Sequence, residues 1–241
     1  MNNVWIIAKR ELNSFFDSLI AIIMIVLFLG FTGFFTWISG SDIFLVGQAS
    51  LQVFFGIAYW TLFFFIPALT MRLIAEEKKT GTIEMLLTKP VTDRQVILGK
   101  YLATIFLIVI ALAFTLPYII TVSKIGNIDI GGTICGYLAL ILISAAYASI
   151  GLFTSSFTSN QIVAFLAALF IGLFFHIIFE FIASGMKGFF GQVINTLSMT
   201  VHFDSLSRGV LDSKDLVYFG SVIFMGLFLT EVSLSKRNAY N

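Results

Sequence analysis

The longest uncharged stretch of the chain, residues 130–178, reads IGGTICGYLALILISAAYASIGLFTSSFTSNQIVAFLAALFIGLFFHII. It contains 49 residues without an Asp, Glu, Lys or Arg, and His176 is its single histidine. A helix that crosses a membrane needs about 20 mostly apolar residues, so this stretch is long enough for two. The polar segment TSSFTSNQ, residues 154–161, divides it near the middle. We therefore predict two membrane-spanning helices, at residues 132–153 and 161–182, joined by a tight turn.

The rest of the chain shows the same alternation of long apolar runs and short charged segments. Charged residues make up 11% of the 241 residues, against about a quarter in soluble proteins. Four further spans are predicted at residues 18–38, 54–73, 98–120 and 215–235. The expected fold class is an all-α polytopic membrane protein, a single transmembrane domain over residues 1–241 with six transmembrane helices. The first apolar run exceeds the roughly 7–15 residues of a signal peptide, so we expect it to be retained.

Basic residues are distributed unequally between the two sides of this predicted membrane domain. Of the 14 Lys and Arg residues, ten lie on the side of both termini and four on the other. Such an excess is typical of the cytoplasmic side, so both termini are predicted to be cytoplasmic. Before the first span, Trp5, Ala8 and Leu12 recur at helical spacing. This spacing favours an interfacial helix over about residues 3–16; the alternative is a charged segment that only orients the first span.

The segment between the second and third spans carries most of the charge on the predicted cytoplasmic side. Residues 76–91 read EEKKTGTIEMLLTKPV, and we call this segment the elbow. Gly81 is suited to end one helix, Thr82 to cap a second, and Pro90 to end that second helix. The following TDRQ, residues 92–95, has the pattern of a capping box that begins span three. Two interpretations remain open: a docking surface for another protein, or a solvated connector whose leucines contact the chain's own spans.

The elbow resembles the signature loop of ABC-2 type exporter permeases. The residues that carry the resemblance are Glu76, Glu77, Gly81, Thr82, Glu84, Leu86, Leu87, Thr88, Pro90 and Val91. The likeness extends over essentially the whole chain, through the Ser/Thr turn before Asn160-Gln161, His202-Phe203 and the sequence RGVLD at 208–212. In its short size, the chain is most similar to the gliding-motility-associated permease subunit of Bacteroidota. The resemblance implies a type V exporter-like fold in a bacterial cytoplasmic (inner) membrane.

The resemblance also implies partners. The elbow would be a coupling helix that contacts a separate ATPase subunit, which would bind ATP and Mg. The contact residues implied are Glu76, Glu77, Gly81, Thr82, Glu84, Met85, Leu86, Leu87 and Pro90. A second permease subunit, identical or different, would complete the translocation path. The connection at 183–214 is modest in length; in the family it dips partly into the membrane, while its sequence fits a lipid-hugging loop equally well.

Several kinds of site have no motif in the sequence. There is no G-x-x-x-x-G-K-[ST] phosphate loop, no G-x-S-x-G and no His-Glu-x-x-His zinc motif. Cys135 is the only cysteine, which excludes an internal disulfide and a cysteine-based metal site. The net charge of +1 does not point to a nucleic-acid partner. We expect a non-catalytic subunit without a cofactor or metal of its own.

Ionisable residues near the spans are candidates for function. His176 and Glu180 are spaced i, i+4, so on an α-helix they could meet. A charge at the bilayer centre costs about 2.5–3.5 kcal/mol, yet Glu180 would lie roughly 28 Å along span five, near the outer surface. The two interpretations are a pair at the exit of a translocation path and a snorkelling pair at the interface. Glu231 is expected to lie at the inner surface beside Lys236 and Arg237.

Small residues at helical spacing indicate where helices approach one another. They are Gly132 and Gly136 in span four, and Ala164, Ala168 and Gly172 in span five. We expect them to pack spans four and five together, and a substrate-lining role is the alternative.

Two main functional hypotheses follow. The first is the membrane half of an ATP-driven exporter whose motor is a separate subunit. The second is an ion-coupled carrier or channel, a class that generally keeps ionisable residues near the membrane midplane. A third hypothesis is a non-transporting subunit that transmits motion to a partner complex.

Overall fold

The computed structural model describes residues 2–39, 49–82, 91–186 and 188–238, and this part of the chain is helical without any strand. The helices are α1 (Asn2–Asp17), α2 (Ile20–Trp37), α4 (Gln52–Thr70), α5 (Ala75–Thr80), α7 (Asp93–Ala113), α8 (Leu116–Ile125), α9 (Ile130–Phe157), α10 (Gln161–Leu173), α11 (Phe179–Gly185), α12 (Phe189–Asn195), α13 (Met199–Ser207) and α14 (Ser213–Asn238). A π-helical turn, η1 (Phe174–Ile178), connects α10 and α11.

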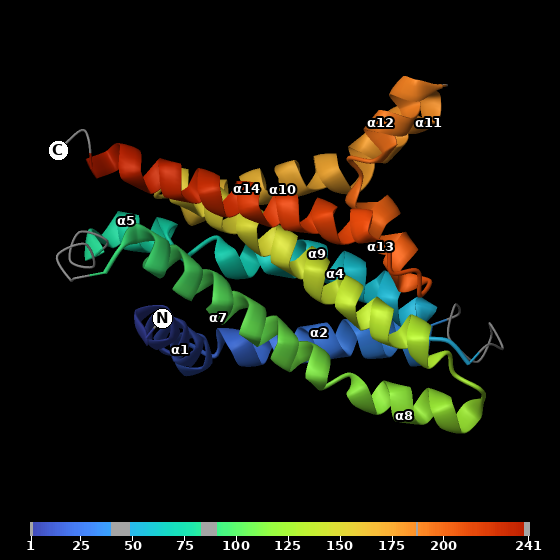
Figure 1. Cartoon of the computed structure of the whole chain (residues 1–241). Coiled ribbons are helices and arrows are strands. Elements are labelled where there is room, and N and C mark those ends of the chain that lie inside the picture. The colour runs from blue at the N-terminus through green and yellow to red at the C-terminus, as the bar shows by residue number, and fades with distance from the viewer. Residues whose placement is uncertain (1, 40–48, 83–90, 187, 239–241) are drawn as a thin grey trace.

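Within the described residues, six helical segments are long and apolar enough to cross a membrane. They are Ile20–Trp37, Gln52–Thr80, Asp93–Ile125, Ile130–Phe157, Gln161–Gly185 and Ser213–Ser235. The predicted fold class, an all-α polytopic membrane protein, is confirmed. The start of α1, the end of α14 and α5 all lie at one end of the bundle (Figure 1), and we call this the α5 end.

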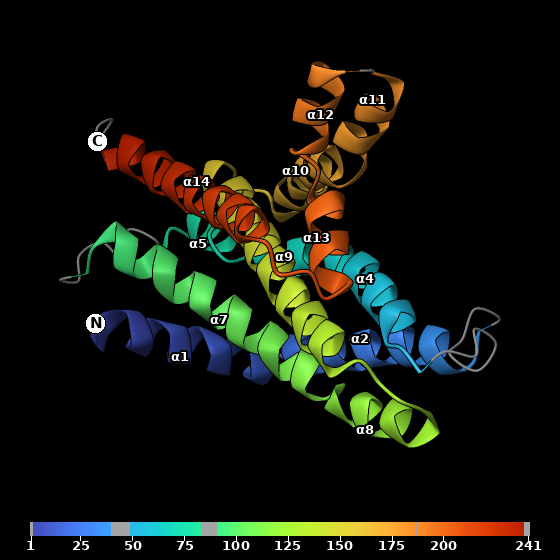
Figure 2. The same cartoon turned by 45° about the vertical axis from the view of Figure 1, so that its right-hand side comes forward.

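Helix α9 lies at the centre of the bundle, with α4, α7, α10 and α14 around it (Figure 2). Glycines allow this close packing, because a side chain at Gly151 would overlap Thr70 of α4, and one at Gly226 of α14 would overlap Ser149. Of the most apolar part of α9, 72% is buried, compared with 22% for α2 and 17% for α14. The other spans therefore keep much of their apolar surface on the outside, where it can face lipid.

The third and fourth predicted spans differ in detail from the observed helices. The third is interrupted, since α7 ends at Ala113 and α8 begins at Leu116. Pro117 is in the first turn of α8, where its missing N–H is tolerated, whereas in a helix interior it would remove a hydrogen bond. Helix α9 continues to Phe157, past the predicted end at 153, because the hydroxyl of Ser156 donates to the Phe153 carbonyl at 2.7 Å and does not break the helix.

The N-terminal helix packs against the third span. Ile7 of α1 fits against Gly99 of α7, and the rings of Trp5 and Phe106 meet edge to face at 5.6 Å. Lys9 is exposed to solvent. Leu19 separates α1 from α2 with a left-handed φ of 59°, so the two helices are distinct elements that meet at a bend.

The predicted capping box at the start of the third span is confirmed. The Thr92 hydroxyl accepts from the Gln95 N–H at 3.3 Å, and the Gln95 side chain accepts from the Thr92 N–H at 3.2 Å. Asn160 caps α10 in a related way, through a 3.0 Å bond from the Ile162 N–H. These caps satisfy N–H groups that have no partner within their own helices.

Candidate functional site

The first residues of α5 are attached directly to α9. The hydroxyl oxygen of Ser155 accepts from the N–H groups of Ile74 and Ala75, at 3.1 and 3.0 Å, and donates to the Met71 carbonyl at 2.9 Å. Lys78, one turn later, donates to the carbonyl of Ser156. Since the first N–H groups of a helix lack partners of their own, Ser155 fixes the start of α5 on the central helix.

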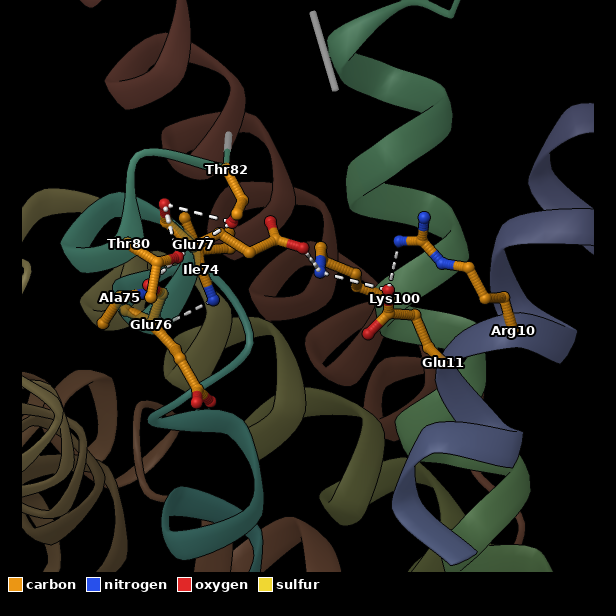
Figure 3. A network of polar contacts seen from close by, with 10 residues as sticks. Arg10, Glu11, Ile74, Ala75, Glu76, Glu77, Thr80, Thr82 and Lys100 are labelled. Atoms are coloured by element: carbon orange, nitrogen blue, oxygen red, sulfur yellow. Dashed lines mark hydrogen bonds and ion pairs between the residues drawn. The ribbon is translucent and has the colours of Figure 1, made fainter. Parts of the chain in front are cut away.

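A charged cluster connects α5 with two more helices (Figure 3). Lys100 of α7 is buried, with 1% of its side chain exposed, and its Nζ lies 2.7 Å from Oε1 of Glu77 in α5. The same Nζ lies 3.4 Å from Oε1 of Glu11 in α1, and Arg10 contacts that oxygen at 2.6 Å. A buried ammonium group without counter-charges would be costly, so Lys100 requires these carboxylates. We call Arg10, Glu11, Glu77 and Lys100 the charged cluster.

The electrostatics of the cluster keep Glu11 ionised. Burial alone would raise the pKa of its carboxyl, but the positive charges of Lys100 and Arg10 outweigh burial and lower that pKa below the usual glutamate range. The charged cluster lines a cavity of about 550 Å³ together with Arg72 and the exposed Glu76. The four charges of the cluster sum to zero, so it joins three helices without adding net charge.

The predicted contact residues of the elbow fall partly within the described structure. Glu76 and Glu77 belong to α5, and Gly81 ends this helix with a left-handed φ of 72°, as its sequence context suggests. The hydroxyl of Thr82 turns back to that of Thr80, at 2.9 Å. The remaining predicted contacts, Glu84, Met85, Leu86, Leu87 and Pro90, lie outside the described residues, as does most of the predicted second helix.

His176 and Glu180 occupy different environments. His176 lies in η1, is 1% exposed, and its Nδ1 is 2.6 Å from the hydroxyl of Tyr147. Its ring stacks on that of Tyr59 at 4.2 Å, and its carbonyl accepts from the hydroxyl of Thr200. We call His176, Tyr147, Tyr59 and Thr200 the aromatic cluster.

The expected contact between His176 and Glu180 is not formed. Glu180 is exposed, and within the described structure no hydrogen bond or ion pair joins the two side chains. The expectation assumed a regular α-helix, whereas the π-helical turn at Phe174–Ile178 changes the register between these positions.

A second histidine forms a buried pair that the sequence analysis did not find. Nδ1 of His202 in α13 lies 2.6 Å from Oδ1 of Asp215 in α14. Nε2 of the same ring lies 2.9 Å from the carbonyl oxygen of Thr196. The pair joins the connection between the fifth and sixth spans to the start of the sixth span. In the sequence, His202-Phe203 appeared only as part of the family resemblance, and the acidic residue in the first turn of an apolar helix is also an ordinary helix-capping pattern.

The described residues contain no group of three or more His, Cys, Asp or Glu side chains that could hold a metal ion. The sequence matches the family model for ABC-2 family transporter proteins over residues 5–230. The chain belongs to the ABC-2 transporter family. No curated protein matches it. ABC-2 membership makes this chain a multi-pass membrane permease. Such transmembrane subunits are generally non-catalytic, and membership implies an ABC ATPase as partner.

The small residues of this ABC-2 protein pack differently from the prediction in span four. Gly136 faces α4, since a side chain there would overlap the ring of Phe55, and Gly132 lies against the carboxylate of Asp129, which caps α9. In span five, Ala164 and Ala168 are buried. The space beside Gly172 is filled by Phe63 of α4 and Tyr147 of α9. Span five therefore packs on both α4 and α9, while the two glycines of span four serve other contacts.

Proposed function

We propose that this ABC-2 protein is the permease subunit of an exporter in which a separate ATPase binds the elbow, residues 76–91. ATP and Mg would be bound by that partner and not by this chain. The observation that carries the proposal is the charged cluster, because it attaches α5 to α7 and α1 through a buried lysine. The sequence pattern of residues 84–90 supports the docking role itself.

The contacts of α5 suggest how motion would spread. A displacement of α5 would pull on α9 through Ser155, on α7 through Lys100 and on α1 through Glu11. Because α9 is the central helix, movement at the elbow would reach most of the bundle. In the proposed mechanism, closure of the ATPase on its nucleotide moves these helices and switches the path between inward and outward access.

The proposal includes the topology and the assembly. Both termini and the elbow would face the cytoplasm, and the membrane would be a bacterial inner membrane; ten of the 14 basic residues lie on that side. Two permease subunits, identical or different, would pair around the path, and the sparsely buried spans α2 and α10 leave apolar surface for such a contact.

A role in gliding motility is a finer proposal that rests on sequence resemblance alone. It predicts that a host lacking this chain loses gliding while its growth is unaffected. The loss should be restored by the wild-type chain and not by one unable to bind the ATPase. If gliding persists in the deletion strain, this part of the proposal is wrong and the exporter assignment is unaffected.

Docking at the elbow can be tested by co-purification of the ATPase. The variant Glu84→Arg/Leu86→Asp changes the charge and apolarity of the elbow and should abolish binding. A matched control, Arg208→Glu/Val210→Asp, makes similar changes at the opposite end, where these side chains are 74% and 57% exposed, and should bind normally. Normal binding by an elbow variant that folds and inserts would contradict the docking assignment.

The carrier and channel alternative predicts transport by the chain alone. Purified protein in vesicles, without an ATPase, should move no substrate if the motor is a separate subunit. Transport driven only by an ion gradient would overturn the proposal.

A further inference from the structure

A groove between α7 and α14 opens on the outside of the bundle, near the α5 end. It encloses about 360 Å³, within the range of small-ligand pockets. Its apolar wall consists of Ile97, Leu98, Phe224, Leu227 and Phe228, and Arg94 and Glu231 form its rim. The groove thus has an apolar wall and a charged rim, a combination that is complementary to an amphiphilic ligand.

The apolar wall is open to its surroundings. Leu98, Phe224 and Phe228 are 40%, 72% and 50% exposed, and the two phenylalanine rings stack in parallel with centroids 6.1 Å apart. One face of α14 carries the groove residues at helical spacing, at positions 224, 227, 228 and 231. The facing residues of α7 are at positions 94, 97 and 98. A long, narrow apolar object can therefore lie between the two helices along their length.

The rim presents the guanidinium group of Arg94, whose terminal nitrogens are available to bind a ligand. Nε of Arg94 donates to Oε1 of Glu231 at 2.5 Å, and 72% of the Arg94 side chain is exposed. Its two terminal nitrogens make no hydrogen bond or ion pair with any residue that the structure describes. Terminal guanidinium nitrogens bind phosphate through two parallel hydrogen bonds, while Glu231 would hold the group in orientation.

The dimensions of the groove match one leaflet. Seven residues separate Phe224 from Glu231, which is roughly 10 Å along a helix, and half of a bilayer's hydrocarbon core is about 15 Å thick. We propose that this groove binds an anionic phospholipid of the leaflet on the α5 side, with its phosphate on Arg94 and one acyl chain along Phe224 and Phe228. The site needs neither the ATPase nor a transported substrate, so it goes beyond the proposed exporter role.

Native mass spectrometry of the purified full chain in detergent tests the proposal. The probes are dioleoyl phosphatidylglycerol, dioleoyl phosphatidylcholine and free glycerol 3-phosphate. We expect preferential binding of the phosphatidylglycerol and no comparable binding of glycerol phosphate. Arg94→Gln should weaken phosphatidylglycerol binding about tenfold, since it removes a charged hydrogen-bonding group. Lys9→Gln, the same loss of charge at an exposed position on α1, should leave binding unchanged.

Two further variants separate the parts of the site. Leu98→Trp should fill the groove and displace the phospholipid. Glu231→Gln should bind phosphatidylglycerol more tightly than the wild type, because it removes a negative charge beside the phosphate, while the amide oxygen can still accept from Nε of Arg94 and keep the guanidinium in orientation. This last prediction keeps the proposal testable if Arg94→Gln fails to fold.

Several outcomes would overturn the lipid site. They are equal binding by the wild type and Arg94→Gln, unchanged binding by Leu98→Trp, or weaker binding by Glu231→Gln. Glycerol phosphate binding as tightly as the phospholipid would show a simple phosphate site. Loss of self-association in Leu98→Trp with phospholipid binding intact would show that a second copy of the chain occupies the groove.

Discussion

The charged cluster and the aromatic cluster each surround a buried polar side chain, Lys100 and His176, but they are built from different groups. At the α5 end, Lys100 is surrounded by two carboxylates from other helices. Within the fifth span, His176 is surrounded by the hydroxyl of Tyr147 and the ring of Tyr59. Full charges thus appear where the cluster borders a polar cavity, and neutral groups appear inside a span, where a charge would be most costly.

This difference suggests different roles. The attraction between opposite charges falls only gradually with distance, so the charged cluster can hold helices together while they move. The aromatic cluster depends on stacked rings and short hydrogen bonds, which require fixed positions. We therefore expect the charged cluster to transmit motion and the aromatic cluster to hold α4, α9 and the fifth span in place.

The largest effect is expected from Lys100→Met, which removes the buried cation and leaves Glu77 without its partner and Glu11 with Arg10 alone. Breaking a buried ion pair from one side costs about 3–5 kcal/mol, so the free energy of unfolding should fall by that amount. Thermal unfolding in detergent measures it. Lys9→Met removes an exposed lysine from the same end and should have little effect. A small effect of Lys100→Met would mean that the cluster is not a structural connection.

The next largest effect is expected from Tyr147→Phe in the aromatic cluster. It removes the hydroxyl 2.6 Å from Nδ1 of His176 and leaves a buried polar atom unpaired, at a cost of about 1–3 kcal/mol. Tyr101→Phe is the control, because the Tyr101 hydroxyl makes no hydrogen bond within the described part of the chain. Unfolding of both variants should be compared with that of the wild type. Equal effects would mean that the hydrogen bond to His176 contributes nothing beyond the loss of a partly or fully buried hydroxyl.

Glu77→Gln should reduce stability less, by about 1–2 kcal/mol, because Glu11 still faces Lys100. Its effect on coupling should be larger than its effect on stability. We expect the permease to stimulate its partner ATPase less in reconstituted vesicles, while the ATPase still binds. Asp17→Asn, which neutralises an exposed carboxylate at the end of α1 and outside the elbow, is the control and should behave like the wild type. If both variants stimulate the ATPase equally, Glu77 does not carry the coupling.

The smallest effect is expected from lowering the pH from 8 to 5. The pKa of Glu11 is lowered in the folded protein, so its contribution is complete above the unfolded value of about 4.3 and is lost as the pH falls through the folded pKa. The difference in unfolding temperature between the wild type and Glu11→Gln should be the same at pH 8 and pH 5, and should shrink only below about pH 4. A difference that declines between pH 8 and 5 would contradict this assignment.

The sequence predicted the features that depend on neighbouring residues. The capping box at Thr92 and Gln95 and the helix end at Gly81 were predicted from local chemistry. The number of spans followed from apolar length alone.

Contacts between distant residues could not be predicted in this way. Lys100 appeared only as one positive charge among ten, because its carboxylate partners are 23 and 89 positions away. Glu231 was expected beside Lys236 and Arg237, whose side chains lie outside the described part of the chain; its observed partner is Arg94, 137 positions earlier. The π-helical turn at Phe174–Ile178 had no signal in composition or periodicity, and it removed the expected contact between His176 and Glu180. Pairing of this kind depends on how the helices assemble.

The left-handed residue Leu19 has a consequence for the whole α5 end. If α1 and α2 formed one straight rod, residues 2–37 would extend roughly 54 Å, well beyond the 30 Å or so of the hydrocarbon core. Glu11 would then be carried away from the bundle, and Lys100 would keep only one of its two counter-charges. A corner in the main chain, set by a single torsion angle, thus decides whether three separate helices share one ammonium group.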